Sequence, residues 1–353
     1  MRFKSFMKTA GLLVLAIVAV GFCTDPQSVI SLFGGHTLPL SGMMLGIIAP
    51  FPIQPELTKI VVAYTNPNHI ADLVLPRVKV GLQSFRYRKY DQADSFTVPT
   101  TLVGRTSRPN KLEYGNTEVA TATQNHGLEA FIPNDDISNA PQGVDPTANH
   151  AQNLIRAIDN DREVRVANLV MNASNYGSSN KQTLSGTSQF SDFTNSKPSS
   201  IILSALDACI MRPTAMVMGQ LVWTTVRQNP DIIKLIYGTA STKGMVTRQD
   251  FIDAFEIKNL FVGESWINTA TAGQTATLSR AWGKSIALIF QEGINMVDGA
   301  VTYGFTAQWQ DRVARTTPEK MGIHDGVCVT VGESVKEVIT APDLGYLIAN
   351  AIA

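Results

Sequence analysis

The sequence predicts an α+β fold, because three kinds of segment follow one another along the chain. Residues 78–132 alternate apolar and polar side chains with the period of two that is typical of half-buried strands. Residues 145–172 place apolar side chains at helical spacing, and residues 199–262 contain short helix-like and strand-like segments in turn. The 353 residues are 44% hydrophobic, which is enough for one large core or two modest cores.

The period-2 region is predicted to be a long two-stranded excursion. Residues 84–90 (SFRYRKY) alternate aromatic and basic side chains and form its first strand, and residues 111–115 (KLEYG) return as its second strand. Short β-rich pieces are expected between them at 96–98 and 101–103. Because an isolated hairpin is marginally stable in water, we expect this one to lie on a neighbouring molecule.

Residues 145–172 carry the strongest helix pattern. Asp145-Pro146 begins the helix, which would be a rod of roughly 40 Å. Charged residues are expected to occupy the polar positions of this helix, between its apolar residues: Asp159, Asp161, Arg162, Glu163 and Arg165. A stretch rich in Ser, Asn, Thr and Gly follows at 177–198 and is expected to be a loop.

The remaining residues are predicted to form a compact α/β region and a set of C-terminal strands. Asn229 would cap a helix beginning at Pro230, and Thr247 with Asp250 resembles a capping box. Further helices are expected at 199–210, 220–227, 251–255 and 343–352. Strands are expected at 215–219, 259–262, 281–291 and 302–309, and in a last hairpin of 327–331 and 335–339 around Gly332-Glu333.

Composition argues against several kinds of site. The 29 basic and 29 acidic residues balance, so no dedicated nucleic-acid-binding surface is indicated, and the low charge favours association between copies. Cys23, Cys209 and Cys328 are an odd number without short spacing, so we expect free thiols rather than disulfides or a metal site. The five histidines show no i, i+4 pair that could hold a metal ion.

No residue pattern predicts catalysis. Asp135-Asp136 follows Pro133 and suits a helix N-terminus better than an acid–base pair. Residues 238–244 lack the terminal Gly-Lys-Ser/Thr order of a phosphate loop, and Gly263-Glu-Ser265 lacks the glycine spacing of a nucleophile elbow. We therefore predict no catalytic residue, no metal ligand and no cofactor.

The N-terminus leaves two interpretations open. Within residues 1–23, three basic residues precede a short apolar run at 11–20, as in a secretory signal. A second apolar stretch at 38–51 is interrupted by Gly and Pro, which is unusual for the start of a mature secreted domain. The N-terminus is therefore either a secretory signal, or residues 1–48 are an arm-like extension, a processed propiece or the product of an upstream start site.

Basic side chains cluster in the predicted hairpin, with aromatic ones between them. Strand alternation places Phe85, Tyr87 and Lys89 on one face. Arg86, Arg88 and Tyr90 lie on the other face. We expect ionic contacts with the acidic face of a neighbouring subunit and weigh nucleic-acid binding as the less favoured alternative. The predicted contact residues are Phe85, Arg86, Tyr87, Arg88, Tyr90, Arg105 and Arg108.

Three groups of segments, in order, resemble one known family. The first comprises residues 51–58 (FPIQPELT), 70–80 (IADLVLPRVKV) and Phe85-Arg-Tyr, and the second runs from Tyr114-Gly115 through 127–140 (GLEAFIPNDDISNA) into the long helix. The third and most specific group is Met216-Val-Met-Gly219, Val222-Trp223, Asn229-Pro-Asp-Ile-Ile233, Lys243-Gly-Met-Val-Thr247, Phe255, Val262-Gly263 and Asn268. Over about residues 51–353, the chain resembles tailed-phage major capsid proteins of the Hong Kong 97 fold.

The resemblance implies a Hong Kong 97-type subunit with an arm, an extended loop, a spine helix and peripheral and axial domains. The implied ranges are 1–50 for an N-terminal extension, 51–77 for an arm leading into the peripheral domain, 78–132 for the extended loop, 133–198 for the peripheral domain with the spine helix, 199–318 for the axial domain, and 319–353 for the return to the peripheral domain with a C-terminal helix. No Lys/Asn pair for a covalent cross-link is identified.

The function implied by the resemblance is structural rather than enzymatic. Copies of the chain would assemble, in the host cytoplasm, as pentamers and hexamers of an icosahedral virion capsid. That shell would enclose double-stranded DNA without sequence-specific binding and without a membrane in the mature particle. The implied partners are a portal protein and scaffolding, protease or decoration proteins. The competing hypothesis, which depends on the N-terminus alone, is a secreted or periplasmic binding protein or hydrolase.

Overall fold

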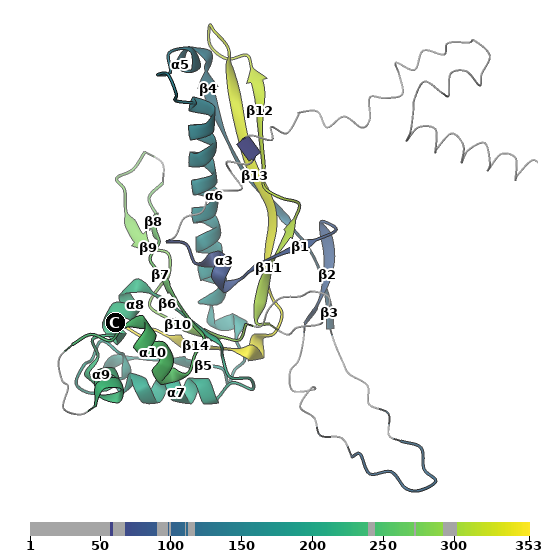
Figure 1. Cartoon of the computed structure of the whole chain (residues 1–353), viewed down its shortest axis with the longest axis vertical. Helices are drawn as coiled ribbons and strands as arrows, with labels where there is room; N and C mark the ends of the chain where they lie inside the picture. Colours follow the sequence, from purple (N-terminus) through teal and green to yellow (C-terminus); the bar gives the residue numbers. More distant parts are fainter. Residues whose placement is uncertain are drawn as a thin grey trace, which may run out of the picture. The chain divides into compact units, whose positions relative to one another are not determined.

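The computed structural model describes residues 57–58, 68–89, 98, 100–109, 111, 117–238, 244–271, 273–291 and 302–353. Within these residues the strands form two five-stranded sheets and two two-stranded hairpins (Figure 1). The predicted extension at 1–50, with Cys23, lies outside the described residues, as does most of the predicted arm at 51–77 up to residue 67. The arm's described part ends in helix α3 (Ala71–Val74).

The first sheet is built around β13, a strand of 14 residues. One edge of β13 pairs with β4 over ten residues, and the opposite edge pairs with β12 and then with β11. Strand β1 extends the sheet, parallel to β11. The bounds are β1 (Arg77–Val80), β4 (Gln124–Pro133), β11 (Gly304–Trp309), β12 (Val313–Glu319) and β13 (Gly326–Ile339).

The predicted last hairpin is wrong, because 327–331 and 335–339 both belong to β13. Gly332 is not a turn residue: it lies opposite Gly127 of β4, where a Cβ would come within 3.0 Å of the His126 carbonyl oxygen. Glycine here lets the two strands approach closely. The chain reverses instead at 320–325, between β12 and β13.

An irregularity interrupts the long antiparallel ladder that β11, β12 and β13 share. Gln308 pairs with Val335 and Val313 with Gly332, so four residues oppose two between these pairs. Gln310, in this bulge, has a φ of 64°. Bulges of this kind redirect side chains near them, and here Arg312 binds Asp159 of the long helix.

Helix α6 (Pro146–Val170) packs on the first sheet and confirms the predicted long helix. The Asp145 carboxylate accepts a hydrogen bond from the Thr147 backbone nitrogen at 2.9 Å, and Pro146 occupies the first turn, as expected for a helix start. Apolar residues of α6 pack against Ile132, Val329 and Val331.

Two of the polar assignments in this helix are wrong. Arg162 and Glu163 are buried, because they occupy positions in register with the apolar stripe. Arg162 lies four residues after Ile158 and four before Val166, and Glu163 lies four before Ala167. The spacing therefore marks both residues as core positions despite their charge.

The three inner strands of the second sheet are buried on both faces. Its strand order is β5-β14-β10-β6-β7, with bounds β5 (Lys181–Thr183), β6 (Ala215–Gly219), β7 (Asn259–Gly263), β10 (Ile286–Ile289) and β14 (Gly345–Ala349). Alternate residues of β6, β10 and β14 enter two different cores. One core contains residues of α7 to α10, and the other contains Val166, Ala167 and Val170 of α6. Burial on both faces explains the uninterrupted apolar sequences of these strands.

Most predicted helices of this region are confirmed: α7 (Pro198–Asp207), α8 (Gln220–Val226), α9 (Pro230–Tyr237) and α10 (Arg248–Phe255). Asn229 caps α9 and Thr247 caps α10, because their side-chain oxygens accept hydrogen bonds from the backbone nitrogens of Asp231 and Asp250. The predicted terminal helix at 343–352 is wrong, since this segment holds the buried strand β14. The predicted loop at 177–198 contains the short strand β5.

Several strands do not follow the predicted domain ranges in their sheet membership. Strands β11 and β12 fall in the range 199–318 expected for the axial domain, yet they pair with β13 in the first sheet. Strand β14 falls in the range 319–353 expected to return to the peripheral domain, yet it pairs with β10 in the second sheet. Strand β4 falls in the predicted extended loop, yet it pairs along β13.

Candidate assembly interface

A chain of ion pairs fastens α6 to the first sheet. Arg77 of β1 binds Asp72 at 2.8 Å and Glu333 at 2.7 Å, and Glu333 also binds Arg312 at 2.9 Å. Both ends of the chain reach α6, since Asp72 binds Arg162 and Arg312 binds Asp159.

The charges of this network shift the pKa values of its carboxylates. Burial alone would raise the pKa of Asp72 and of Glu333, but the adjacent arginines outweigh burial, and both pKa values lie below their ordinary values. For Asp159 burial prevails over Arg312, so the pKa of that carboxyl is raised. The network is therefore stabilised when Asp72 and Glu333 are ionised.

Glu163 forms a second internal anchor that connects three segments. Its carboxylate is fully buried and accepts hydrogen bonds from the backbone nitrogens of Ile70 and Ala71 at 3.0 and 2.9 Å. It also accepts from Trp282 Nε1 at 2.6 Å and from Ser265 Oγ at 3.4 Å. Four donors satisfy the oxygens of this buried side chain. Sequence reasoning missed this site, although the helical position of Glu163 is its signal.

The base of the predicted hairpin packs on its own chain. Strands β2 (Ser84–Lys89) and β3 (Thr117–Ala122) pair antiparallel, so the first strand is confirmed. The predicted returning strand at 111–115 lies, apart from Lys111, outside the described residues. Phe85 and Tyr87 pack against the cluster of Phe305, Ala307 and Val338. At its base, therefore, one face of the hairpin lies on its own chain rather than on a neighbouring molecule, and Arg86 on the other face is exposed.

The β2–β3 hairpin and α6 contact opposite faces of the first sheet. Thr306 accepts a hydrogen bond from Arg162 of α6 at 3.1 Å, whereas its neighbours Phe305 and Ala307 contact the hairpin cluster. Successive residues of a strand point to opposite faces. The hairpin base thus covers the sheet face that α6 leaves open.

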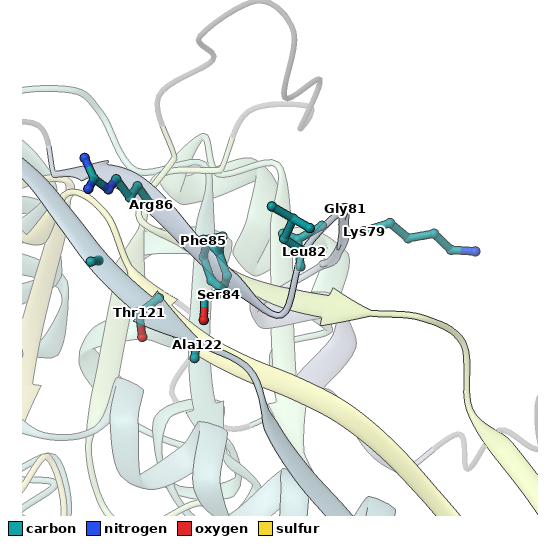
Figure 2. A pocket seen from close by; sticks show the side chains of 10 residues that line it. Lys79, Gly81, Leu82, Ser84, Phe85, Arg86, Thr121 and Ala122 are labelled. Carbon is teal, nitrogen blue, oxygen red and sulfur yellow. The ribbon is translucent and has the colours of Figure 1, made fainter. Parts of the chain in front are cut away.

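An open hollow of about 930 Å³ lies between the β1–β2 turn and β3. Figure 2 shows Leu82 and Phe85 beside Thr121 and Ala122 of the paired strand. Its rim carries Lys79, which pairs with Asp311, and Arg86, which pairs with Glu118. With both cations paired on their own chain, the hollow is a mainly apolar, surface-exposed feature.

The distal part of the excursion is exposed wherever the structure describes it. Residues 100–109 are exposed throughout and form no strand, so the predicted β piece at 101–103 is wrong. Arg105 and Arg108 lie in this loop. The side chain of Arg88, the whole of Tyr90 and residues 112–116 lie outside the described residues. The structure thus separates the seven predicted contact residues: Phe85 and Tyr87 face their own sheet, while Arg86, Arg105 and Arg108 face outward.

A second projecting feature lies at the far end of the β12–β13 ladder. Helix α5 (Asn134–Ser138) is fastened to the turn at 320–325. The Asn134 side chain donates to the His324 carbonyl at 2.8 Å, and its backbone nitrogen donates to Asp325 O at 3.1 Å. Asp135 and Asp136 occupy the first turn of α5, as predicted for a helix start.

The described residues offer little for chemistry. They contain no cluster of three or more His, Cys, Asp or Glu side chains placed to hold a metal ion. Burial raises the pKa of the Cys209 thiol to about 12, which suppresses its reactivity. Ser265 is buried against Glu163. No helix in this part of the chain has the length and apolar character needed to cross a bilayer.

One comparison decides the family. The chain is 45% identical over 306 residues to the major capsid protein of Pseudomonas phage JBD67, an alignment that covers 86% of this chain and 99% of the relative. The chain belongs to the major capsid proteins of phages. No protein-family model matches it.

Solved structures give the fold of this major capsid protein. A phage-related protein from Bordetella bronchiseptica RB50 matches with a TM-score of 0.65 at 17% identity, covering 85% of this chain and 98% of that one. The capsid structure of cyanophage P-SCSP1u matches with a TM-score of 0.51 at 10% identity, covering 89% and 95%. The fold is therefore the Hong Kong 97-type capsid fold, as the sequence resemblance implied.

The family assignment settles the general function. As a phage major capsid protein, the chain is a structural subunit that self-assembles into the capsid shell of the virion. Neither the relatives nor the solved structures favour the competing secreted binding protein or hydrolase.

Proposed function

We propose that this capsid protein forms an icosahedral shell, built of pentamers and hexamers, around the double-stranded DNA of a tailed phage, and that it does no chemistry. The observation that carries this proposal is the 45% identity to a phage major capsid protein across 99% of that relative's length. The balanced net charge suits a shell that encloses DNA without binding it strongly. A portal protein, and scaffolding, protease or decoration proteins, would be its partners in assembly.

The exposed loop at the end of the β2–β3 hairpin is proposed as a contact between subunits. Arg86, Arg105 and Arg108 are the members of the predicted contact set that face outward in the described chain, and Arg86 already pairs with Glu118. Phe85 and Tyr87 support the loop from beneath by packing on β11 and β13. A supported base with an exposed end suits a loop that reaches a neighbour.

A loop deletion tests this role without disturbing the hairpin base. Lys89 and Thr117 form the last pair of the β2–β3 ladder, so residues 90–116 can be replaced by Asn-Gly, which suits a two-residue hairpin turn. We expect a folded, soluble subunit that no longer forms particles in electron micrographs. Normal particles from this variant would contradict the proposed role of the loop.

The enclosed DNA and the absence of chemistry need separate measurements. Particles isolated from phage-producing cells should protect double-stranded DNA from nuclease, and that DNA should share no common binding motif. Purified subunits should lack hydrolase activity on ester, peptide and phosphate substrates. Nuclease-sensitive DNA in intact particles would contradict the packaging part of the proposal.

A further inference from the structure

A hollow of about 230 Å³ lies on the first sheet, where β4, β13 and the bulge between β11 and β12 meet. Its lining contains Gly127 and Gly332, which lie opposite one another on β4 and β13 and form its floor. Neither residue has a side chain to fill the space above the backbone. A glycine inside a strand often marks a place where a ligand approaches closely.

The hollow lies on the face of the sheet opposite α6. Val331 packs with residues of α6, so its neighbours Thr330 and Gly332 point to the other face. Trp309 follows Ala307 by two residues on β11, and Ala307 belongs to the hairpin cluster on that same face. The indole of Trp309 is therefore a wall of the hollow beside the glycine floor.

Uncharged polar side chains accompany this indole. The lining residues with amide or hydroxyl groups are Asn125, Gln310, Thr330 and Ser334. Ser334 is bonded to Thr123 at 2.8 Å, whereas the side chains of Asn125, Gln310 and Thr330 form no hydrogen bond within the described residues. The indole N–H of Trp309 likewise has no acceptor in this part of the chain. The hollow thus presents free donors and acceptors.

The two carboxylates that line the hollow are already paired on their own chain. Asp311 binds Lys79 at 2.8 Å. Glu333 binds Arg77 at 2.7 Å and Arg312 at 2.9 Å. Because these partners neutralise both carboxylates, the hollow favours a neutral ligand.

We propose that the hollow binds a neutral sugar ring of a glycan. The C–H face of such a ring packs on an aromatic face, which Trp309 offers, and its hydroxyls bind amide and hydroxyl side chains. The volume lies below the roughly 300–1,000 Å³ of sites for drug-sized ligands, so it suits a single ring. In a capsid shell, many copies of this site would add their weak affinities on one polysaccharide.

Two other ligand classes match the hollow less well. A nucleotide could stack its base on Trp309, but its phosphate would meet no Lys or Arg among the lining residues and would lie near Asp311. An apolar side chain of a partner protein could cover the indole, but it would leave the free amide and hydroxyl groups without partners. A ring that carries hydroxyls satisfies both the indole and these polar side chains.

Saturation-transfer NMR on assembled particles tests the proposal, because this method detects weak ligands of very large assemblies. Glucose, galactose, mannose and N-acetylglucosamine are titrated one at a time, with glucose 6-phosphate and adenosine monophosphate as charged comparators. We expect at least one neutral sugar to bind with a Kd of about 1–10 mM, as its small number of atoms allows. The charged comparators should bind about tenfold more weakly or not at all.

Substitutions distinguish this hollow from other sites. Trp309→Ala should weaken sugar binding about tenfold or more, and Thr330→Val, which keeps the shape of the side chain, about threefold. The matched control is Trp266→Ala in the hairpin of β8 (Trp266–Asn268) and β9 (Leu278–Arg280), because Trp266 is a 54% exposed indole outside the hollow. This control should bind sugar as the original chain does. If Trp309→Ala forms no particles, Thr330→Val and Asn125→Ala decide the outcome.

Three results would overturn the proposal. The first is no saturable binding of any neutral sugar up to about 100 mM, which is also the result expected if another subunit covers the hollow in the shell. The second is binding that the substitutions in the hollow leave unchanged, since the sugar would then lie elsewhere. The third is tighter binding of the phosphorylated comparators, which would show a site for charged ligands.

Discussion

Replacing Glu163 should destabilise the subunit more than replacing any exposed glutamate. The Glu163 carboxylate is fully buried on α6 and accepts hydrogen bonds from two backbone nitrogens ahead of β1, from the Trp282 indole and from Ser265. Glu163→Ala leaves these donors without an acceptor and opens a cavity between α3, α6 and the segment around Trp282. The free energy of unfolding therefore falls for two reasons: buried donors lose their acceptor, and the cavity removes packing contacts.

The geometry sets the size of the effect. Three of the four bonds are 3.0 Å or shorter, and each buried donor left unpaired costs about 1–3 kcal/mol. The carboxylate's own desolvation penalty disappears with it, which offsets part of this cost. We expect Glu163→Ala to lower the free energy of unfolding by about 3–5 kcal/mol. Glu163→Gln keeps one acceptor oxygen, so we expect about half that loss.

Urea unfolding of unassembled subunits, followed by circular dichroism, measures this difference. The matched control is Glu264→Ala, because Glu264 is a partly exposed glutamate that binds Arg248 at 2.7 Å. An exposed pair of this kind contributes about 1 kcal/mol or less. If Glu163→Ala costs no more than Glu264→Ala, the buried carboxylate is not the anchor described above.

Two further predictions concern the ion-pair network and backbone packing. The pKa values of Asp72 and Glu333 lie below their ordinary values, so these carboxylates add stability above their unfolded-state pKa of about 4 and lose it as the pH falls through the folded-state values. We therefore expect the free energy of unfolding to decline below about pH 5, and Glu333→Gln to flatten that decline. The raised pKa of Asp159 acts in the opposite direction and offsets part of this decline. Urea titrations between about pH 7 and about pH 3 measure how steeply the free energy of unfolding falls with pH. An unchanged slope in Glu333→Gln would contradict the role assigned to Glu333 in the network. Gly263→Ala would bring a methyl group closer to the Trp282 indole than van der Waals contact allows, whereas a methyl group on Gly81 meets nothing within 4 Å. Thermal unfolding should show that Gly263→Ala lowers the free energy of unfolding by at least about 1–3 kcal/mol, whereas Gly81→Ala changes it by no more than about 0.5 kcal/mol. Equal effects of the two substitutions would refute the packing assignment.

The sequence predicted best those elements whose signals are local. Asp145-Pro146 fixed the start of α6, and Asn229 and Thr247 are caps in the structure as expected. The alternation in 84–89 gave β2 and the faces of its side chains. These signals depend on hydrogen bonds and side-chain periods within a few residues, which a single sequence contains.

The errors arose where distant segments decide the structure. The apolar run of β14 is buried on both faces, and a short run of that kind cannot be told from a helix by its period. Gly332 was predicted to be a turn residue because the neighbouring sequence gives no sign of the close approach of Gly127, which lies more than two hundred residues earlier. The helical position of Glu163 indicates burial, but its hydrogen-bond donors could not be predicted because they come from residues far along the chain.

The sequence correctly placed the Phe85 and Tyr87 side chains on the same face of β2, but it did not predict which surface packs against that face. Strand alternation shows which side chains share a face and leaves open what packs on that face. Here β11 and β13, encoded more than two hundred residues later, cover the base of the hairpin. The loop beyond that base could be predicted as exposed from its polar, turn-rich sequence.

The double-sided pairing of β13 determines where foreign peptides can be inserted into this subunit. Residues 326–332 are paired on both edges, with β4 and with β12. One added residue there would move every later side chain of the strand to the opposite face, so α6 would meet the wrong residues. Residues 104–108 are exposed and belong to no strand, so a guest sequence placed there shifts no ladder, although Arg105 and Arg108 lie in the loop proposed as a contact between subunits. The pairing of β13 therefore excludes insertions within 326–332, and the effect on particle formation of an insertion at 104–108 reports on the proposed contact between subunits.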